Sequence, residues 1–121
     1  MGVQKKINIQ NKKARFEFEI LDKYTAGIQL TGTEIKSIRE SKARITESFC
    51  EFNDRGELFI VNMYIEEYSF GHHFNHKTTS ERRLLLNKRE LRSLQKDVEA
   101  KGNTIVPLRL FLNENGWAKL E

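Results

Sequence analysis

The apolar residues of this sequence gather in short runs of strand length that are separated by turn-forming residues. From 15 to 20 the pattern alternates, with Phe16, Phe18 and Ile20 on one side, and this period of two is typical of a half-buried strand. Further runs of strand length occupy 26–30, 45–52, 58–65, 83–86, 104–112 and 116–120. The Asn-Asp-Arg-Gly segment at 53–56 has turn chemistry and predicts a hairpin.

Two helices are expected between the strands, because two capping signals occur. Thr31 lies three residues before Glu34, and Asn87 lies three residues before Glu90, which is the spacing of a capping box. The first helix is expected to end near Ser41, and the second at Gly102.

These elements predict an all-β fold, namely an OB-fold antiparallel β-barrel of about six strands with two to three flanking helices. Among small barrels the OB-fold is favoured because its groove binds oligonucleotides, although the pattern alone leaves a sandwich or an α+β sheet open. The 121 residues fit one compact domain, and the sequence has no repeat or linker. We expect a flexible basic N-terminal arm at 1–10, followed by a single domain at 11–121.

The charge distribution favours a polyanionic partner. The net charge is +4 with a pI near 9.3, and such a balance suits nucleic acid or an anionic membrane surface. The basic residues concentrate in two segments, 1–16 and 75–96, which could form one face or two separate solvated surfaces.

The sequence also indicates in which cellular compartment the protein is expected. Cys50 is the single cysteine, so an intramolecular disulfide is excluded and a reducing compartment is favoured. No apolar run approaches the length of a membrane span, and no secretory h-region is present. We therefore expect a soluble, cytoplasmic protein without a membrane partner.

Two features could carry catalysis, and neither is favoured. His72, His73 and His76 could bind a metal, but a loop that uses His and Asn to contact RNA, or simply a polar loop, is the better interpretation. Cys50 could be a nucleophile, but its place in an expected strand favours a buried structural role. The sequence predicts no enzyme, no metal site and no cofactor.

Two basic segments suit phosphate contacts. The segment at 11–15 joins three cations to an asparagine amide, and the segment at 82–89 carries cations on both sides of a strand that enters a helix N-terminus. Aromatic residues near the long loop could stack on bases, but packing within the protein is the favoured role for Tyr64, Tyr68, Phe70 and Phe74.

Three segments, in order and spacing, resemble the SmpB (SsrA-binding protein) family. They are Asn-Lys-Lys-Ala-Arg at 11–15 with the Ala-Gly-Ile-Gln-Leu-Thr-Gly-Thr-Glu-Ile-Lys-Ser-Ile-Arg run at 26–39, the Phe-Asn-His and Arg-Arg-Leu-Leu-Leu-Asn-Lys-Arg-Glu-Leu runs at 74–76 and 82–91, and the Gly-Asn-Thr-Ile-Val-Pro-Leu run at 102–108. The resemblance covers the chain from about Asn11 to its last residue.

The resemblance implies an OB-fold RNA-binding protein without catalytic residues. It implies binding to the tRNA-like domain of transfer-messenger RNA and delivery of that RNA to stalled ribosomes in trans-translation, with elongation factor Tu as an indirect partner through the RNA. We expect a monomer. The alternative is a generic single-strand RNA-binding or ribosome-associated OB-fold module.

Carried over by position, Asn11 matches an RNA-contacting asparagine of the family, and Leu85 and Asn87 match positions that matter for RNA binding. The full set of residues expected to contact RNA is Asn11, Lys12, Lys13, Arg15, Lys36, Arg39, Lys42, Asn75, His76, Arg82, Arg83, Leu85, Asn87, Lys88 and Arg89.

This chain departs from the family pattern in two places. Thr25 stands where the family often has Glu, so a carboxylate contact to RNA does not carry over there. Family members also continue beyond the position of Glu121 into a basic tail that is needed for rescue. We therefore expect the 121-residue chain to bind the RNA without supporting tagging.

Overall fold

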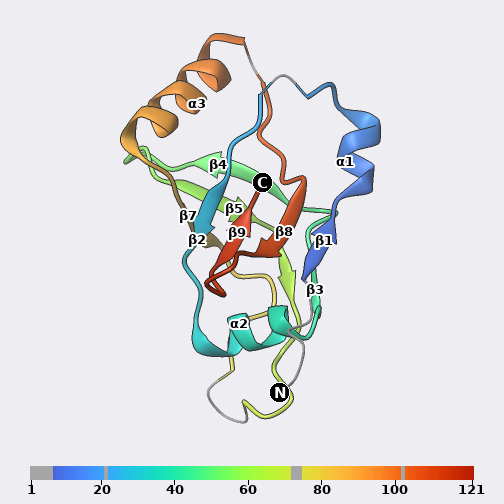
Figure 1. Ribbon diagram of the computed structural model, residues 1–121. Coiled ribbons are helices and arrows are strands. Elements are labelled where there is room, and N and C mark those ends of the chain that lie inside the picture. Colours follow the sequence, from blue (N-terminus) through green and yellow to red (C-terminus); the bar gives the residue numbers. More distant parts are fainter. Residues whose placement is uncertain (1–6, 21, 72–74, 102) are drawn as a thin grey trace.

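The computed structural model describes residues 7–20, 22–71, 75–101 and 103–121, and its main feature is a curled antiparallel sheet (Figure 1). The sheet has seven strands in the order β1-β8-β9-β2-β7-β5-β4, and β3 and β6 form a separate pair. The strands are β1 (Asn8–Gln10), β2 (Ala26–Ile28), β3 (Ala43–Arg44), β4 (Phe49–Phe52), β5 (Leu58–Val61), β6 (Tyr64–Ile65), β7 (Arg82–Leu85), β8 (Arg109–Leu112) and β9 (Ala118–Leu120). The helices are α1 (Lys12–Glu17), α2 (Gly32–Arg39) and α3 (Lys88–Lys101).

The sheet curls around one apolar core. The β4 edge approaches the chain just before β8, where the Cys50 amide donates to the Ile105 carbonyl at 2.9 Å. Side chains that alternate along the strands fill the interior, among them Ile60 and Leu110, and Met63 between β5 and β6 joins them; each is 0% exposed. The predicted antiparallel, mainly β architecture with flanking helices is confirmed, although the strands are shorter and more numerous than the expected six.

Both predicted capping boxes are present. At α2 the Thr31 hydroxyl accepts from the Glu34 amide, and the Glu34 carboxylate accepts from the Thr31 amide. At α3 the Asn87 side chain accepts from the Glu90 amide at 2.8 Å, and the Glu90 carboxylate accepts from the Asn87 amide. The reciprocal bonds satisfy amides that a helix start otherwise leaves free.

The predicted hairpin also forms, with β4 paired to β5. Gly56 closes its turn with a φ of +76°, a conformation that glycine adopts without steric cost. The strand expected at 58–65 is instead divided in two, because Asn62 has a φ of 63° and turns the chain between β5 and β6.

The strand predicted at 15–20 is wrong, because residues from 12 to 17 form α1. The Asn11 side chain accepts from the Ala14 amide at 3.1 Å and starts the helix. Phe16 is 93% exposed and Phe18 44% exposed, so the alternating aromatics that suggested a strand do not enter the core.

The arm predicted at 1–10 needs correction over its last residues. Ile7 is 3% exposed in the core, and β1 pairs with β8 through Asn8 opposite Phe111 and Gln10 opposite Arg109. This pairing places 7–10 in the sheet because an apolar side chain at Ile7 anchors the segment. Residues 1–6 lie outside the described part of the chain.

Among the described residues, none of the helices has the length and apolar character needed to cross a bilayer.

Candidate RNA interface

Arg82, one of the residues expected to contact RNA, is buried and has a structural role. Its side chain is 2% exposed and pairs with the Glu34 carboxylate, which is 4% exposed. Of the other two guanidinium nitrogens, Nη1 donates to the Met63 carbonyl and Nη2 donates to the carbonyls of Lys77 and Thr78, both at 3.1 Å. All three guanidinium nitrogens of Arg82 therefore donate inside the protein, and in this structure the side chain is turned away from any ligand surface.

Asn11 is buried as well. It is 1% exposed, its amide nitrogen donates to the Pro107 carbonyl at 2.9 Å, and its oxygen caps α1. The expected direct contact of the Asn11 side chain with RNA is therefore not available. What Asn11 does is fix the start of the helix that carries Lys12, Lys13 and Arg15.

Asn75 and His76 hold the long loop against its neighbours. The Asn75 amide group donates to the Tyr68 carbonyl at 2.7 Å and accepts from the Tyr68 amide at 3.0 Å. His76 bonds the Ile65 carbonyl through Nε2 and the Thr33 hydroxyl through Nδ1, both at 2.9 Å. Since a carbonyl only accepts, Nε2 carries a proton. Both residues are half-buried and their polar atoms are engaged, so they position the loop rather than offer free groups.

Close packing of the same loop depends on Gly71. A β-carbon at Gly71 would lie 2.6 Å from the Asn75 nitrogen and 3.1 Å from a methyl carbon of Thr33. A side chain at position 71 would therefore displace the Asn75 amide from its bonds to Tyr68 and crowd Thr33 of α2.

Several expected contacts are exposed but already have a partner. Lys13 pairs with Glu47 at 3.4 Å, Lys42 lies 3.8 Å from Glu40, and Lys36 lies over the Tyr68 ring at 5.5 Å from its centroid. Exposed pairs of this kind are weak, and a phosphate group can replace the carboxylate.

Arg15 is likewise exposed and paired. It lies 3.5 Å from the Glu121 carboxylate, which also contacts Arg109 at 3.4 Å. Two guanidinium groups thus share one carboxylate, so this site keeps a net positive charge.

The expected residues do not form one patch. Figure 1 shows α1 and α3 at one end of the sheet and α2 at the other. Lys36, Arg39 and Lys42 belong to α2 and the turn after it, so they lie away from the other basic groups.

The most open group lies where β7 meets α3, and we call it the β7–α3 edge. Its residues are exposed and include two cations at the helix start; they are Arg83, Leu85, Asn87, Lys88 and Arg89. Leu85 is 50% exposed although it is apolar. The start of α3 adds the positive end of a helix dipole, which favours an anion. Cations, an apolar side chain and a helix start together suit a nucleic acid better than they suit solvent alone.

Arg83 at this edge pairs with Glu57 at 3.1 Å, and its side chain is 44% exposed. The Asn53 side-chain hydrogen bond, followed by the nearby guanidinium groups of Arg83 and Arg55, lowers the pKa of Glu57. Glu57 therefore stays ionised at neutral pH and is the group with which a phosphate would compete for Arg83.

Two further cations were missed by the sequence analysis. Arg92 and Lys96 follow Lys88 at spacings of four on α3, and all three are exposed. That spacing places them on one helix face, next to the β7–α3 edge. The same spacing in the predicted helix was the signal that could have found them.

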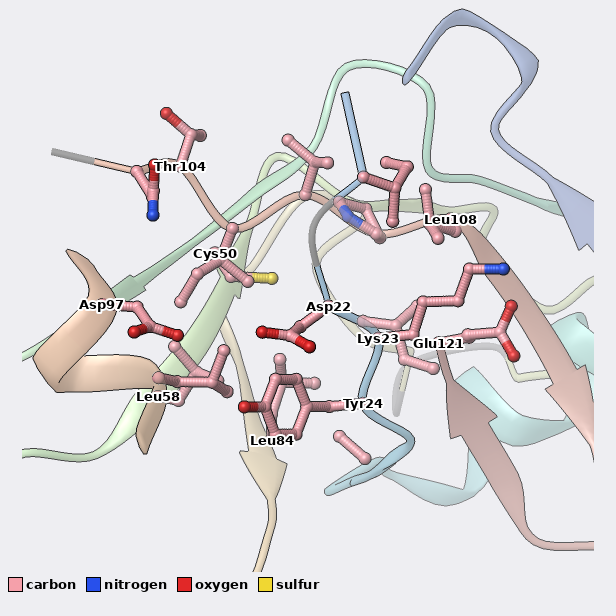
Figure 2. Close-up of a pocket in the computed structure, with 18 of the residues that line it drawn as sticks. Asp22, Lys23, Tyr24, Cys50, Leu58, Leu84, Asp97, Thr104, Leu108 and Glu121 are labelled. Atoms are coloured by element: carbon pink, nitrogen blue, oxygen red, sulfur yellow. The ribbon is translucent and has the colours of Figure 1, made fainter. Parts of the chain in front are cut away.

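The largest cavity described has the wrong chemistry for RNA. It has a volume of about 570 Å³ and lies between α3, the segment before β2 and the segment before β8 (Figure 2). Its walls are largely apolar, and the carboxylates of Asp22 and Asp97 point into it. Acidic side chains outnumber the one lysine of the lining, Lys23, so this cavity disfavours a phosphate group.

Cys50 lines the same cavity but is 8% exposed. Burial raises the pKa of its thiol to about 12, so the thiol is protonated at neutral pH. This agrees with the structural role favoured by the sequence. Of the possible metal ligands, His72 and His73 lie outside the described residues, as does Phe74. Within the described part of the chain no group of three or more His, Cys, Asp or Glu side chains is placed to hold a metal ion.

Comparison with known proteins gives consistent matches. The family model described as "SmpB protein" matches residues 8–121. Similar proteins named "SsrA-binding protein" come from Flavobacterium johnsoniae, at 69% identity over 97% of this chain and 77% of that protein, and from Bacteroides thetaiotaomicron, at 53% identity over the same shares. A solved structure described as "tmRNA-SmpB: a journey to the center of the bacterial ribosome" contains a chain with a TM-score of 0.76 and 47% identity, covering 94% of this chain and 79% of that one.

Proposed function

The chain belongs to the SmpB protein family, and from this premise we propose that it binds the tRNA-like domain of transfer-messenger RNA and helps to deliver that RNA to stalled ribosomes. The ribosome and transfer-messenger RNA are its partners in trans-translation. The similar proteins are named "SsrA-binding protein", and the description of the related solved structure names tmRNA, SmpB and the bacterial ribosome.

The observation that carries this proposal is the β7–α3 edge. It presents an exposed guanidinium, an exposed leucine and the cationic start of a helix within one short segment. Guanidinium and ammonium groups position a phosphate backbone, and an apolar side chain adds a contact that salt does not screen.

Thr25 completes this edge. Gly27 pairs with Leu85 in the antiparallel register, so the residue two before Gly27 lies toward Asn87. Thr25 is exposed there, and its hydroxyl can donate one hydrogen bond to RNA where a carboxylate can only accept.

We propose further that the chain acts by binding rather than by catalysis, in the cytoplasm where ribosomes are found. Its one thiol is buried and protonated, which supports this reading.

The test is a binding titration of this chain with the isolated tRNA-like domain and with an unrelated hairpin of equal length, over a series of salt concentrations. A preference for the tRNA-like domain that persists at high salt supports recognition of RNA shape. Equal affinities that fall together as salt rises would contradict the proposal and favour the generic single-strand module, which binds through phosphate attraction and stacking.

A further inference from the structure

The outward face of the sheet carries a continuous strip beside the β7–α3 edge. Across β7, β2, β9 and β8 the register places Leu85 opposite Gly27, Gly27 opposite Lys119, and Lys119 opposite Phe111. Residues opposite one another in a sheet point to the same side. Three strand spacings make this strip about 14 Å long.

Trp117 belongs to the same outward face. Its neighbours Ala118 and Leu120 are 6% and 3% exposed and point inward, so Trp117 and Lys119 point outward. Trp117 is 69% exposed, although its backbone is fixed by hydrogen bonds to Asn113. An exposed indole on a fixed stretch of backbone thus projects from the sheet into solvent.

The neighbours of Trp117 have the chemistry that suits a nucleotide. Arg109 lies over the Phe111 ring at 4.0 Å from its centroid, and Lys119 lies opposite Phe111 in the register and two residues after Trp117. Gly27 has no side chain to fill the middle of the strip. A β-carbon at Gly27 would lie 3.5 Å from the β-carbon of Leu85, so Leu85 is its direct neighbour. An exposed indole ring, nearby cations and the open space above Gly27 suit an unpaired base with its phosphate.

The strip is also open and joined to the proposed interface. Figure 1 shows β2, β9, β8 and β1 side by side, with the helices above and below them rather than across their outward side. Leu85 belongs to both the strip and the β7–α3 edge, so one RNA can contact both.

We propose that this outward strip is a stacking site for an unpaired RNA base, with Trp117 as the stacking residue and Lys119 as the phosphate contact. The inference rests on the proposed function and adds to it a site on β8 and β9. A base stacked there would come from a loop of the bound RNA, because a base inside a duplex does not expose its face.

Trp117 is the single tryptophan of the chain, so its fluorescence reports on this site alone. One titration with the tRNA-like domain, carrying a dye for anisotropy, measures binding and tryptophan emission together. We expect emission to be quenched in step with binding. Trp117→Ala is expected to weaken binding about fivefold to hundredfold, and Trp117→Phe, which keeps a stacking ring, to retain most of the affinity.

The matched control is Phe49→Ala, an exposed aromatic on β4 at the opposite edge of the sheet, which should leave affinity unchanged. Binding without quenching, or an unchanged affinity in Trp117→Ala, would overturn the stacking site and leave the proposed function standing. If the natural chain does not bind the RNA, the proposed function and this inference both fail.

Discussion

Arg82 and Arg83 are adjacent in sequence and belong to opposite sides of the sheet. Arg82 points inward, where it joins Glu34 of α2 to the carbonyls of the long loop. Arg83 points outward, where its side chain is 44% exposed and meets a single carboxylate, Glu57. One residue of the pair holds the fold together, and the other is available to a ligand.

The comparison extends to the regions around them. Like Arg82, the residues Asn11 before α1 and Asn75 and His76 in the long loop have polar atoms that bind within the protein. The outward side contains Leu85 and Lys88, which face solvent. The motif at 82–89 therefore contains both buried residues that stabilise the fold and exposed residues that can contact a ligand. Loss of RNA binding on mutation does not distinguish the two kinds.

The largest effect is expected from Arg82→Gln. Removing the guanidinium leaves the Glu34 carboxylate buried without its cation, which costs about 3–5 kcal/mol of unfolding free energy. Urea denaturation measures this loss. Arg83→Gln is the matched control and should change stability by less than about 0.5 kcal/mol.

If the two side chains form a pair, Glu34→Gln should lower the unfolding free energy by less in an Arg82→Met background than in the natural chain. In that background Glu34→Gln removes a carboxylate charge that has no cation beside it. Equal costs in the two backgrounds would show that the two side chains are not coupled.

The second effect concerns Asn11→Ala, which removes a helix cap and leaves the Pro107 carbonyl without its donor. We expect a loss of about 1–3 kcal/mol of stability. Thermal unfolding measures it, and RNA affinity under conditions where the variant is fully folded should stay close to that of the natural chain. Full stability combined with weaker RNA binding would instead make Asn11 a direct contact and contradict its burial.

Leu85→Ala tests the outward side. Burying the exposed half of this side chain against RNA is worth about 1 kcal/mol, so the affinity should fall about fivefold. Because the contact is apolar, the slope of log affinity against log salt should not change. A changed slope would mean that the substitution disturbs the neighbouring cations.

Arg83→Gln and Lys88→Gln should each change the slope of log affinity against log salt, which Leu85→Ala leaves unchanged. Each lost phosphate contact lowers the salt slope by about 1, with a similar effect on related and unrelated RNA. A filter-binding series over salt measures both slopes. Identical slopes in the natural chain and Arg83→Gln would remove Arg83 from the interface.

The smallest effect is a gain. Glu57→Gln releases Arg83 from its carboxylate, so RNA affinity at low salt should rise about twofold to fivefold. The gain should disappear in the Arg83→Gln background, which serves as the control.

The helix caps and the hairpin were predictable from the sequence, because they depend on residues that are close together in the chain. The capping boxes at Thr31 and Asn87 and the hairpin closed by Gly56 form as predicted, because each involves residues within four positions. The alternating aromatics at 15–20 misled because Asn11 supplies a cap that starts α1 instead.

Burial of the site residues was not predictable in the same way. Arg82 finds its partner 48 positions away in Glu34, and Asn11 finds Pro107 96 positions away. Only the fold brings these groups together, so a sequence motif rich in cations gave no sign that one arginine is enclosed. The open outward face of β8 and β9 likewise depends on strand order, which no local pattern specifies.

The most direct test of the contrast is arginine-selective chemical footprinting with phenylglyoxal, read by mass spectrometry with and without the tRNA-like domain. Arg83 should react in the free protein and be protected by the RNA. Arg82 should stay unreactive in both samples and react only after unfolding. Modification of Arg82 in the folded free protein, followed by protection in the complex, would place it in the interface and contradict the division between the two sides of the sheet.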